Sequence, residues 1–148
     1  MAIMKGMMNN PARNVTARTL LFAILCILMV ITYSCKDTVS SPDTSGIVFP
    51  ASNVSYGKNV EPLFLQACAF SGCHDTESRA DQLSLDNYQD AISSKPGVII
   101  AKDTTQSRLV WRIEGKYGLA PMPFQRPALT TNQITGLKKW ILEGAQNN

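Results

Sequence analysis

The chain has 148 residues and a formal net charge of +3, from 14 Lys and Arg against 11 Asp and Glu. Lys5, Arg13 and Arg18 account for three of the positive charges, so the rest of the chain carries 11 basic and 11 acidic side chains. This balance, with no basic patch and no acidic tail, excludes a protein that binds nucleic acid through its surface charge.

Residues 1–35 have the pattern of a bacterial export signal. Basic residues precede an apolar run over residues 20–31, which is too short to span a bilayer comfortably. Cys35 follows this run and resembles the lipidated cysteine of a lipoprotein. Thr32 and Tyr33 depart from the usual residues before that cysteine, so a plain signal peptide and an uncleaved anchor are the alternatives. We expect an exported protein of the periplasm or cell envelope, attached to the membrane by lipid at Cys35.

The next residues, 36–55, are mainly Ser, Thr, Asp and Pro, which predicts a flexible linker between the lipid anchor and a folded domain. We expect that domain to cover residues 56–148. A domain of this size has a marginal apolar core, and such domains commonly need a disulfide, a metal or a cofactor to complete it.

The apolar spacing of the folded part predicts helices and no sustained strand. The first helix is expected over residues 59–68, with Asn59 as its cap and Pro62 in its first turn. Shorter helices are expected near residues 86–92 and 105–114. The last helix begins with a capping box from Thr130 to Gln133 and stops near residue 144. We further expect aromatic side chains, Phe64 of the first helix and Trp140 of the last, to meet where these helices approach each other.

The sequence Cys68-Ala69-Phe70-Ser71-Gly72-Cys73-His74 contains two thiols and the only histidine of the chain. A cysteine pair followed directly by histidine is typical of c-type haem attachment, in which both sulfurs bind the haem vinyl groups and the imidazole binds iron. The usual spacing has two residues between the cysteines, whereas this chain has four. Small residues let the longer loop bulge, and Gly72 can adopt backbone angles that other residues avoid.

Two other readings of the motif stay open. Cys68 and Cys73 could close a small disulfide loop in an exported domain, with His74 an ordinary surface residue. They could also bind zinc together with His74, but a closed zinc site needs four protein ligands and only a carboxylate such as Asp75 remains for the fourth position.

Met122 is the only methionine beyond residue 29, and it lies 48 residues after His74 in Ala120-Pro121-Met122-Pro123. Flanking prolines prevent a regular helix, so the thioether is expected on a stiff extended loop. A thioether opposite histidine fills the sixth position of haem iron and favours its reduced form. Met122 could instead be a loop residue that fills a gap in the core.

Taken together, these motifs resemble a class I cytochrome c domain, in particular the small cytochrome domains of planctomycetes and related bacteria. The resemblance covers most of residues 56–145. It includes the following residues: Phe64, Ser71 to His74, Leu83-Ser84-Leu85 with Tyr88, Ser107-Arg108-Leu109, Met122-Pro123, and Leu129 leading to Trp140-Ile141 and Gly144-Ala145.

The resemblance implies a small all-α fold with helices wrapped around one covalently bound haem c per chain. Cys68 and Cys73 would form the thioethers, and His74 and Met122 would be the axial ligands. It also offers Arg108 or Arg112 as a partner of a haem propionate, although a solvated helix face accounts for these arginines as well.

We therefore expect a mono-haem electron carrier with an unidentified redox protein as its partner. We expect no enzymatic activity, because the chain has no second histidine to act as an acid or base. The alternatives are a haem-free exported binding module stapled by a Cys68–Cys73 disulfide, and a haem enzyme or sensor whose iron has an open position.

Overall fold

The computed structural model describes residues 21–22, 24–25 and 43–148, and the folded domain discussed below comprises residues 43–148. The export signal, Cys35 and residues 36–42 of the expected linker therefore lie almost entirely outside the described residues. No helix within the described part of the chain is both long enough and apolar enough to cross a bilayer.

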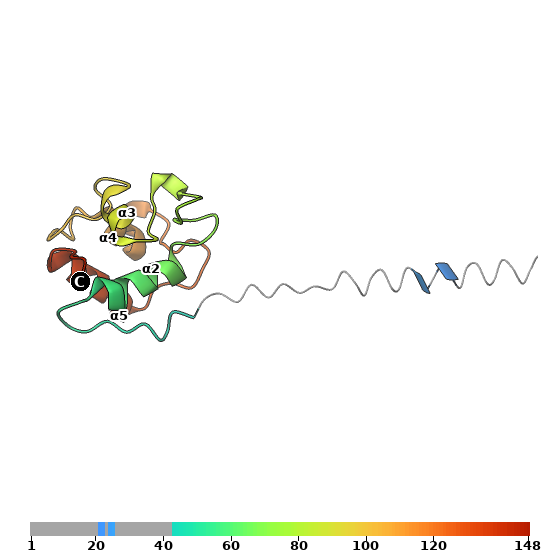
Figure 1. The fold of residues 1–148 in the computed structure, drawn as a ribbon, viewed down its shortest axis with the longest axis horizontal. Coiled ribbons are helices and arrows are strands. Elements are labelled where there is room, and N and C mark those ends of the chain that lie inside the picture. The colour runs from blue at the N-terminus through green and yellow to red at the C-terminus, as the bar shows by residue number, and fades with distance from the viewer. Residues whose placement is uncertain (1–20, 23, 26–42) are drawn as a thin grey trace, which may run out of the picture. The chain divides into compact units, whose positions relative to one another are not determined.

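The domain is helical, and no strand occurs among residues 43–148, which confirms the all-α class. Its helices are short and are joined by irregular loops (Figure 1). In chain order they are η1 (Tyr56–Val60), α2 (Glu61–Ala67), η2 (Ala80–Gln82), α3 (Tyr88–Ser93), α4 (Arg108–Glu114), η3 (Lys116–Gly118) and α5 (Thr131–Leu142).

The first helical segment begins earlier than predicted. Ser55, and not Asn59, is the N-cap, and its hydroxyl accepts a hydrogen bond from the Lys58 N–H at 3.3 Å. The chain makes one π-helical turn, η1, before Pro62 enters the first turn of α2. Pro62 has no N–H and cannot donate a hydrogen bond to the preceding helical turn. It lies in the first turn of α2, where η1 has ended and no such bond is needed. The prediction of Asn59 as the cap is therefore wrong, whereas the position of Pro62 is confirmed.

The last helix follows the sequence prediction closely. In the capping box, Gln133 N–H donates to Thr130 Oγ1 at 3.2 Å and Thr130 N–H donates to Gln133 Oε1 at 2.9 Å. Phe64 of α2 and Trp140 of α5 pack edge to face with ring centroids 6.4 Å apart. Both are buried, so the expected aromatic contact between the first and last α-helices is confirmed.

The N-terminal segment, residues 43–55, packs along α5 rather than forming a free linker. Phe49 and Val54 are buried in the core. The side chain of Asn132 bonds to both the N–H and the C=O of Phe49, at 2.8 and 3.0 Å, and Glu143 accepts from the Val54 N–H at 2.9 Å. The folded domain thus starts about ten residues before the predicted boundary at residue 56, and the linker prediction is wrong for the part that the structure describes.

Candidate functional site

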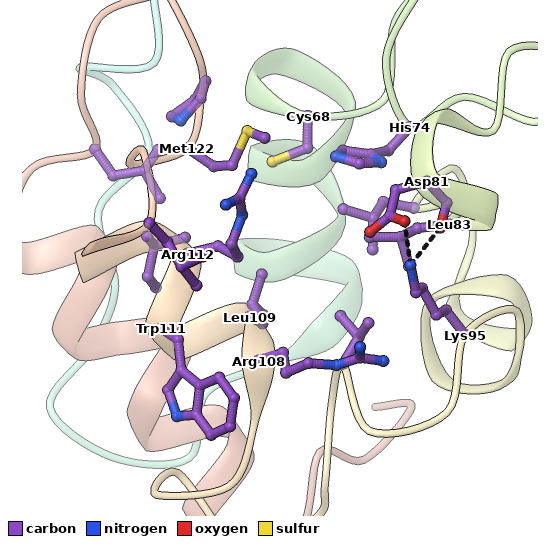
Figure 2. A pocket seen from close by; sticks show the side chains of 16 residues that line it. Cys68, His74, Asp81, Leu83, Lys95, Arg108, Leu109, Trp111, Arg112 and Met122 are labelled. Carbon is purple, nitrogen blue, oxygen red and sulfur yellow. Dashed lines mark hydrogen bonds and ion pairs between the residues drawn. The ribbon is translucent and has the colours of Figure 1, made fainter. Parts of the chain in front are cut away.

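A pocket opens where the C-terminal end of α2, helix α4 and the loop before α5 come together (Figure 2). Its cavity volume is about 140 Å³. The walls are mainly apolar and are formed by Leu83, Leu85, Val98, Leu109, Ile113, Leu119, Pro123 and Leu129. Cys68, His74 and Met122, three of the residues predicted to bind haem, line the same pocket.

The loop between the two cysteines folds back on itself, which brings His74 close to Cys68. The His74 N–H donates to the Cys68 carbonyl at 3.1 Å, and the Cys73 N–H donates to the Phe70 carbonyl at 2.9 Å. Gly72 adopts a positive φ of 85°, as its glycine identity predicts. The unusual gap of four residues is thus accommodated as a compact turn beyond the end of α2.

The ring of His74 is oriented by a hydrogen bond to the backbone. Its Nδ1 lies 3.0 Å from the Ala80 carbonyl oxygen. A carbonyl can only accept, so Nδ1 carries the hydrogen and the neutral imidazole has its lone pair on Nε2. This is the arrangement of metal-binding histidines, whose second nitrogen commonly donates to a carbonyl or carboxylate.

The two cysteines have different surroundings. Cys68 points into the pocket beside His74 (Figure 2), and burial, assisted by the nearby Cys73 thiol, raises its pKa to about 12. Cys68 is therefore a neutral thiol at neutral pH. Cys73, which is half-buried like Cys68, is not among the residues that line the pocket. Both are free thiols in this structure.

Met122 enters the pocket from the side opposite His74, with Cys68 between them (Figure 2). Its backbone N–H donates to the carbonyl of Arg112 on α4 at 2.8 Å. The loop presents the thioether towards the imidazole, although the two residues are far apart in the sequence.

Positive charge exceeds negative charge around the pocket. Lys95, Arg108 and Arg112 line it together with one carboxylate, Asp81. Lys95 forms an ion pair with Asp81 and holds the pKa of that carboxyl below its usual value. Arg108 donates to the Pro96 carbonyl at 2.7 Å. Three cations and one anion leave a surplus of two positive charges.

Arg112 is the cation drawn nearest to the candidate ligands. In the view of Figure 2 its guanidinium lies below the side chains of Met122 and Cys68, and the figure draws no hydrogen bond or ion pair from it to another lining residue. A guanidinium in an apolar pocket is costly unless it has an anionic partner, so this geometry suits a ligand with a carboxylate.

Sequence reasoning did not identify Lys95 and Asp81 as pocket residues. Asp81 has a left-handed backbone with φ of 55°, and nothing in the sequence signals that conformation.

Among the residues that the structure describes, no three His, Cys, Asp or Glu side chains are grouped as metal ligands, so the zinc site with Asp75 gains no support. Cys35 lies outside the described residues.

Comparison with protein-family models, curated proteins and solved structures found no match. The interpretation of the site therefore depends on its own geometry.

Proposed function

We propose that this chain is a mono-haem c-type cytochrome that carries electrons through His/Met-ligated iron. The observation that carries the proposal is the pairing of His74, whose Nε2 is free to bind a metal, with the Met122 thioether on the other side of an apolar pocket. These are the two ligand types of an electron-transfer haem that has no open position on its iron.

The residues around the pocket suit the chemistry of haem. Its two propionates carry two negative charges, which match the surplus of two positive charges from Lys95, Arg108, Arg112 and Asp81. Arg112 is the favoured propionate partner because its guanidinium already reaches into the pocket without an anion. The bound haem would take up the space that this guanidinium fills, so we expect the side chain to turn with the propionate.

In this proposal each residue of the motif has one role. The thiols of Cys68 and Cys73 attach the chain to the two vinyl groups. Cys73 lies outside the pocket lining, so its attachment requires the turn around Gly72 to adjust. Ala80 holds the imidazole of His74 in its binding orientation, and Arg112 C=O fixes the backbone of Met122.

Haem supplies the one-electron chemistry, and the protein controls its surroundings. The apolar walls keep water away, and a thioether ligand raises the reduction potential relative to a second histidine. Asp81, the one carboxylate that lines the pocket, is paired with Lys95. We propose that the domain works outside the cytoplasm, tethered by lipid at Cys35, and exchanges electrons with a protein partner.

The first experiment is expression of the full chain in a host that attaches haem c, followed by absorbance spectra before and after reduction. The expected result is a Soret band and a sharp α-band, with haem that stays on the protein after acid–acetone extraction. Cys68→Ala combined with Cys73→Ala should release the haem on extraction, whereas the matched control Ser71→Ala should retain it. A wild-type protein without haem bands would contradict the proposed function and favour a haem-free binding module.

The distal ligand needs its own test. Met122→Ala should abolish the methionine–iron charge-transfer band of the ferric protein while the covalent haem remains. An unchanged band would mean that Met122 is not the ligand and that the iron has another sixth ligand or an open position.

A further inference from the structure

The segment that follows Met122, residues 123–129, is held by few contacts. The chain turns at Phe124 and Gln125, and among the hydrogen bonds of the described domain none joins this segment to another part of the fold. Phe124 is 57% exposed, and only Leu129 at the far end is buried. Loops with so little burial and hydrogen bonding open at low free-energy cost.

Pro123 and Leu129 line the pocket at the two ends of this segment, and one further contact ties its middle to the rest of the site. The guanidinium carbon of Arg126 lies 4.0 Å from the centre of the Phe70 ring, within the range of a cation–π interaction. No salt bridge competes for Arg126 among the ion pairs of residues 43–148.

Phe70 is part of the turn between the two cysteines and is itself well fixed. The Cys73 N–H donates to its carbonyl at 2.9 Å, and the preceding Ala69 N–H donates to Phe64 of α2 at 2.7 Å. Arg126 therefore connects the loop that carries Met122 to the loop that carries Cys68 and His74.

We propose that the Arg126–Phe70 contact is a latch that closes the Met122 loop over the pocket and sets how readily Met122 leaves the iron. Arg126 is a positioning residue, since it acts through Met122 and does not touch the pocket. The inference rests on the proposed haem site. The latch also gives the longer spacing between Cys68 and Cys73 a role, because the added residues let this turn present the Phe70 ring to the loop that carries Met122.

The test is an imidazole titration of the ferric full-length protein, in which added imidazole competes with Met122 for iron. Arg126→Met keeps the length of the side chain but removes its charge. We expect imidazole to bind about fivefold more tightly to this variant, the effect of losing one partly exposed cation–π contact. Lys58→Met, which removes an equally positive but exposed charge outside the pocket, is the matched control and should bind imidazole as the wild type does.

Three further variants separate a latch from a general loosening of the fold. Phe70→Leu should raise the affinity for imidazole as much as Arg126→Met does. The double variant should bind imidazole no more tightly than either single variant. Arg126→Lys should restore much of the wild-type affinity. A weaker or absent charge-transfer band in Arg126→Met would also count for the latch.

The latch and the haem site fail in different ways. Wild-type protein with haem and with the methionine band, but with the same imidazole affinity in wild type and Arg126→Met, would overturn the latch alone. Additive effects of the Arg126 and Phe70 variants would also overturn it. Wild-type protein without haem bands would overturn the proposed function.

Discussion

Gly136 on α5 is the position where the packing of the N-terminal segment can be tested most sharply. A Cβ added there would lie 2.1 Å from Cγ of Phe49 and 2.2 Å from its Cδ1. Ordinary contacts between carbon atoms are about 3.5–4.0 Å, so the ring of Phe49 has to move. Cβ of Phe49 would lie 2.3 Å from the added atom as well, so rotation of the ring alone does not relieve the clash. The backbone of Phe49, which Asn132 holds, has to shift together with the ring.

Two opposing effects set the size of the change. Alanine is better than glycine in the interior of a helix by about 1 kcal/mol. Expulsion of the Phe49 ring loses up to about 3 kcal/mol of burial. We therefore expect Gly136→Ala to lower the free energy of unfolding by about 1–2 kcal/mol, in spite of its better helix propensity.

Urea denaturation followed by far-UV circular dichroism measures this change. Thr135→Ala, at an exposed position of the same helix, is the control for helix propensity and should leave the stability unchanged or slightly raised. In a Phe49→Gly background all three clashing atoms, Cβ included, are gone, so Gly136→Ala should become stabilising by about 1 kcal/mol. If Gly136→Ala destabilises the protein equally in both backgrounds, the loss does not come from Phe49 and the packing argument is wrong.

Three further substitutions test other parts of the fold. The hydroxyl of Tyr56 is buried without a hydrogen-bond partner, and burial raises its pKa. Tyr56→Phe should therefore leave the free energy of unfolding unchanged or raise it by up to about 1 kcal/mol. A clear loss of stability in urea denaturation would show that the hydroxyl has a partner. Lys116 and Lys138 hold the pKa of Glu114 below its ordinary 4.5, so Lys138→Met should cost less than about 1 kcal/mol at pH 7. Because a lowered carboxyl pKa stabilises the fold above the ordinary value, this cost should shrink as the pH falls through the lowered pKa, and a cost that is constant from pH 7 to pH 3 would contradict the ion pair. Gly72→Ala should destabilise the cysteine turn by about 1 kcal/mol because of its positive φ, and a stability equal to that of the wild type would mean that the turn has another conformation.

Much of the helical framework follows from local sequence rules. The capping box at Thr130 depends on spacing within a single helix, and it is present. The contact between Phe64 of α2 and Trp140 of α5 joins two helices, and it is expected because each residue lies on the apolar face of its own helix. The gathering of Cys68, His74 and Met122 around one pocket also agrees with the sequence prediction. Whether these residues bind haem stays a prediction.

Features that depend on partners far away in the chain were beyond the sequence rules. Phe49 and Val54 lie in a segment rich in Ser, Thr and Pro. They become part of the core because α5 provides a glycine and the side chain of Asn132, and the C-cap of α5 provides the carboxylate of Glu143. The contact between Arg126 and Phe70 likewise joins two irregular loops, and no periodic pattern marks either residue.

The intact mass of the protein purified from a host that attaches haem c decides whether the chain is a c-type cytochrome. We expect the mass of the chain plus one haem, and we expect the haem to be lost only when both Cys68 and Cys73 are replaced. A chain recovered at its bare polypeptide mass, with or without a Cys68–Cys73 disulfide, would contradict the proposed function.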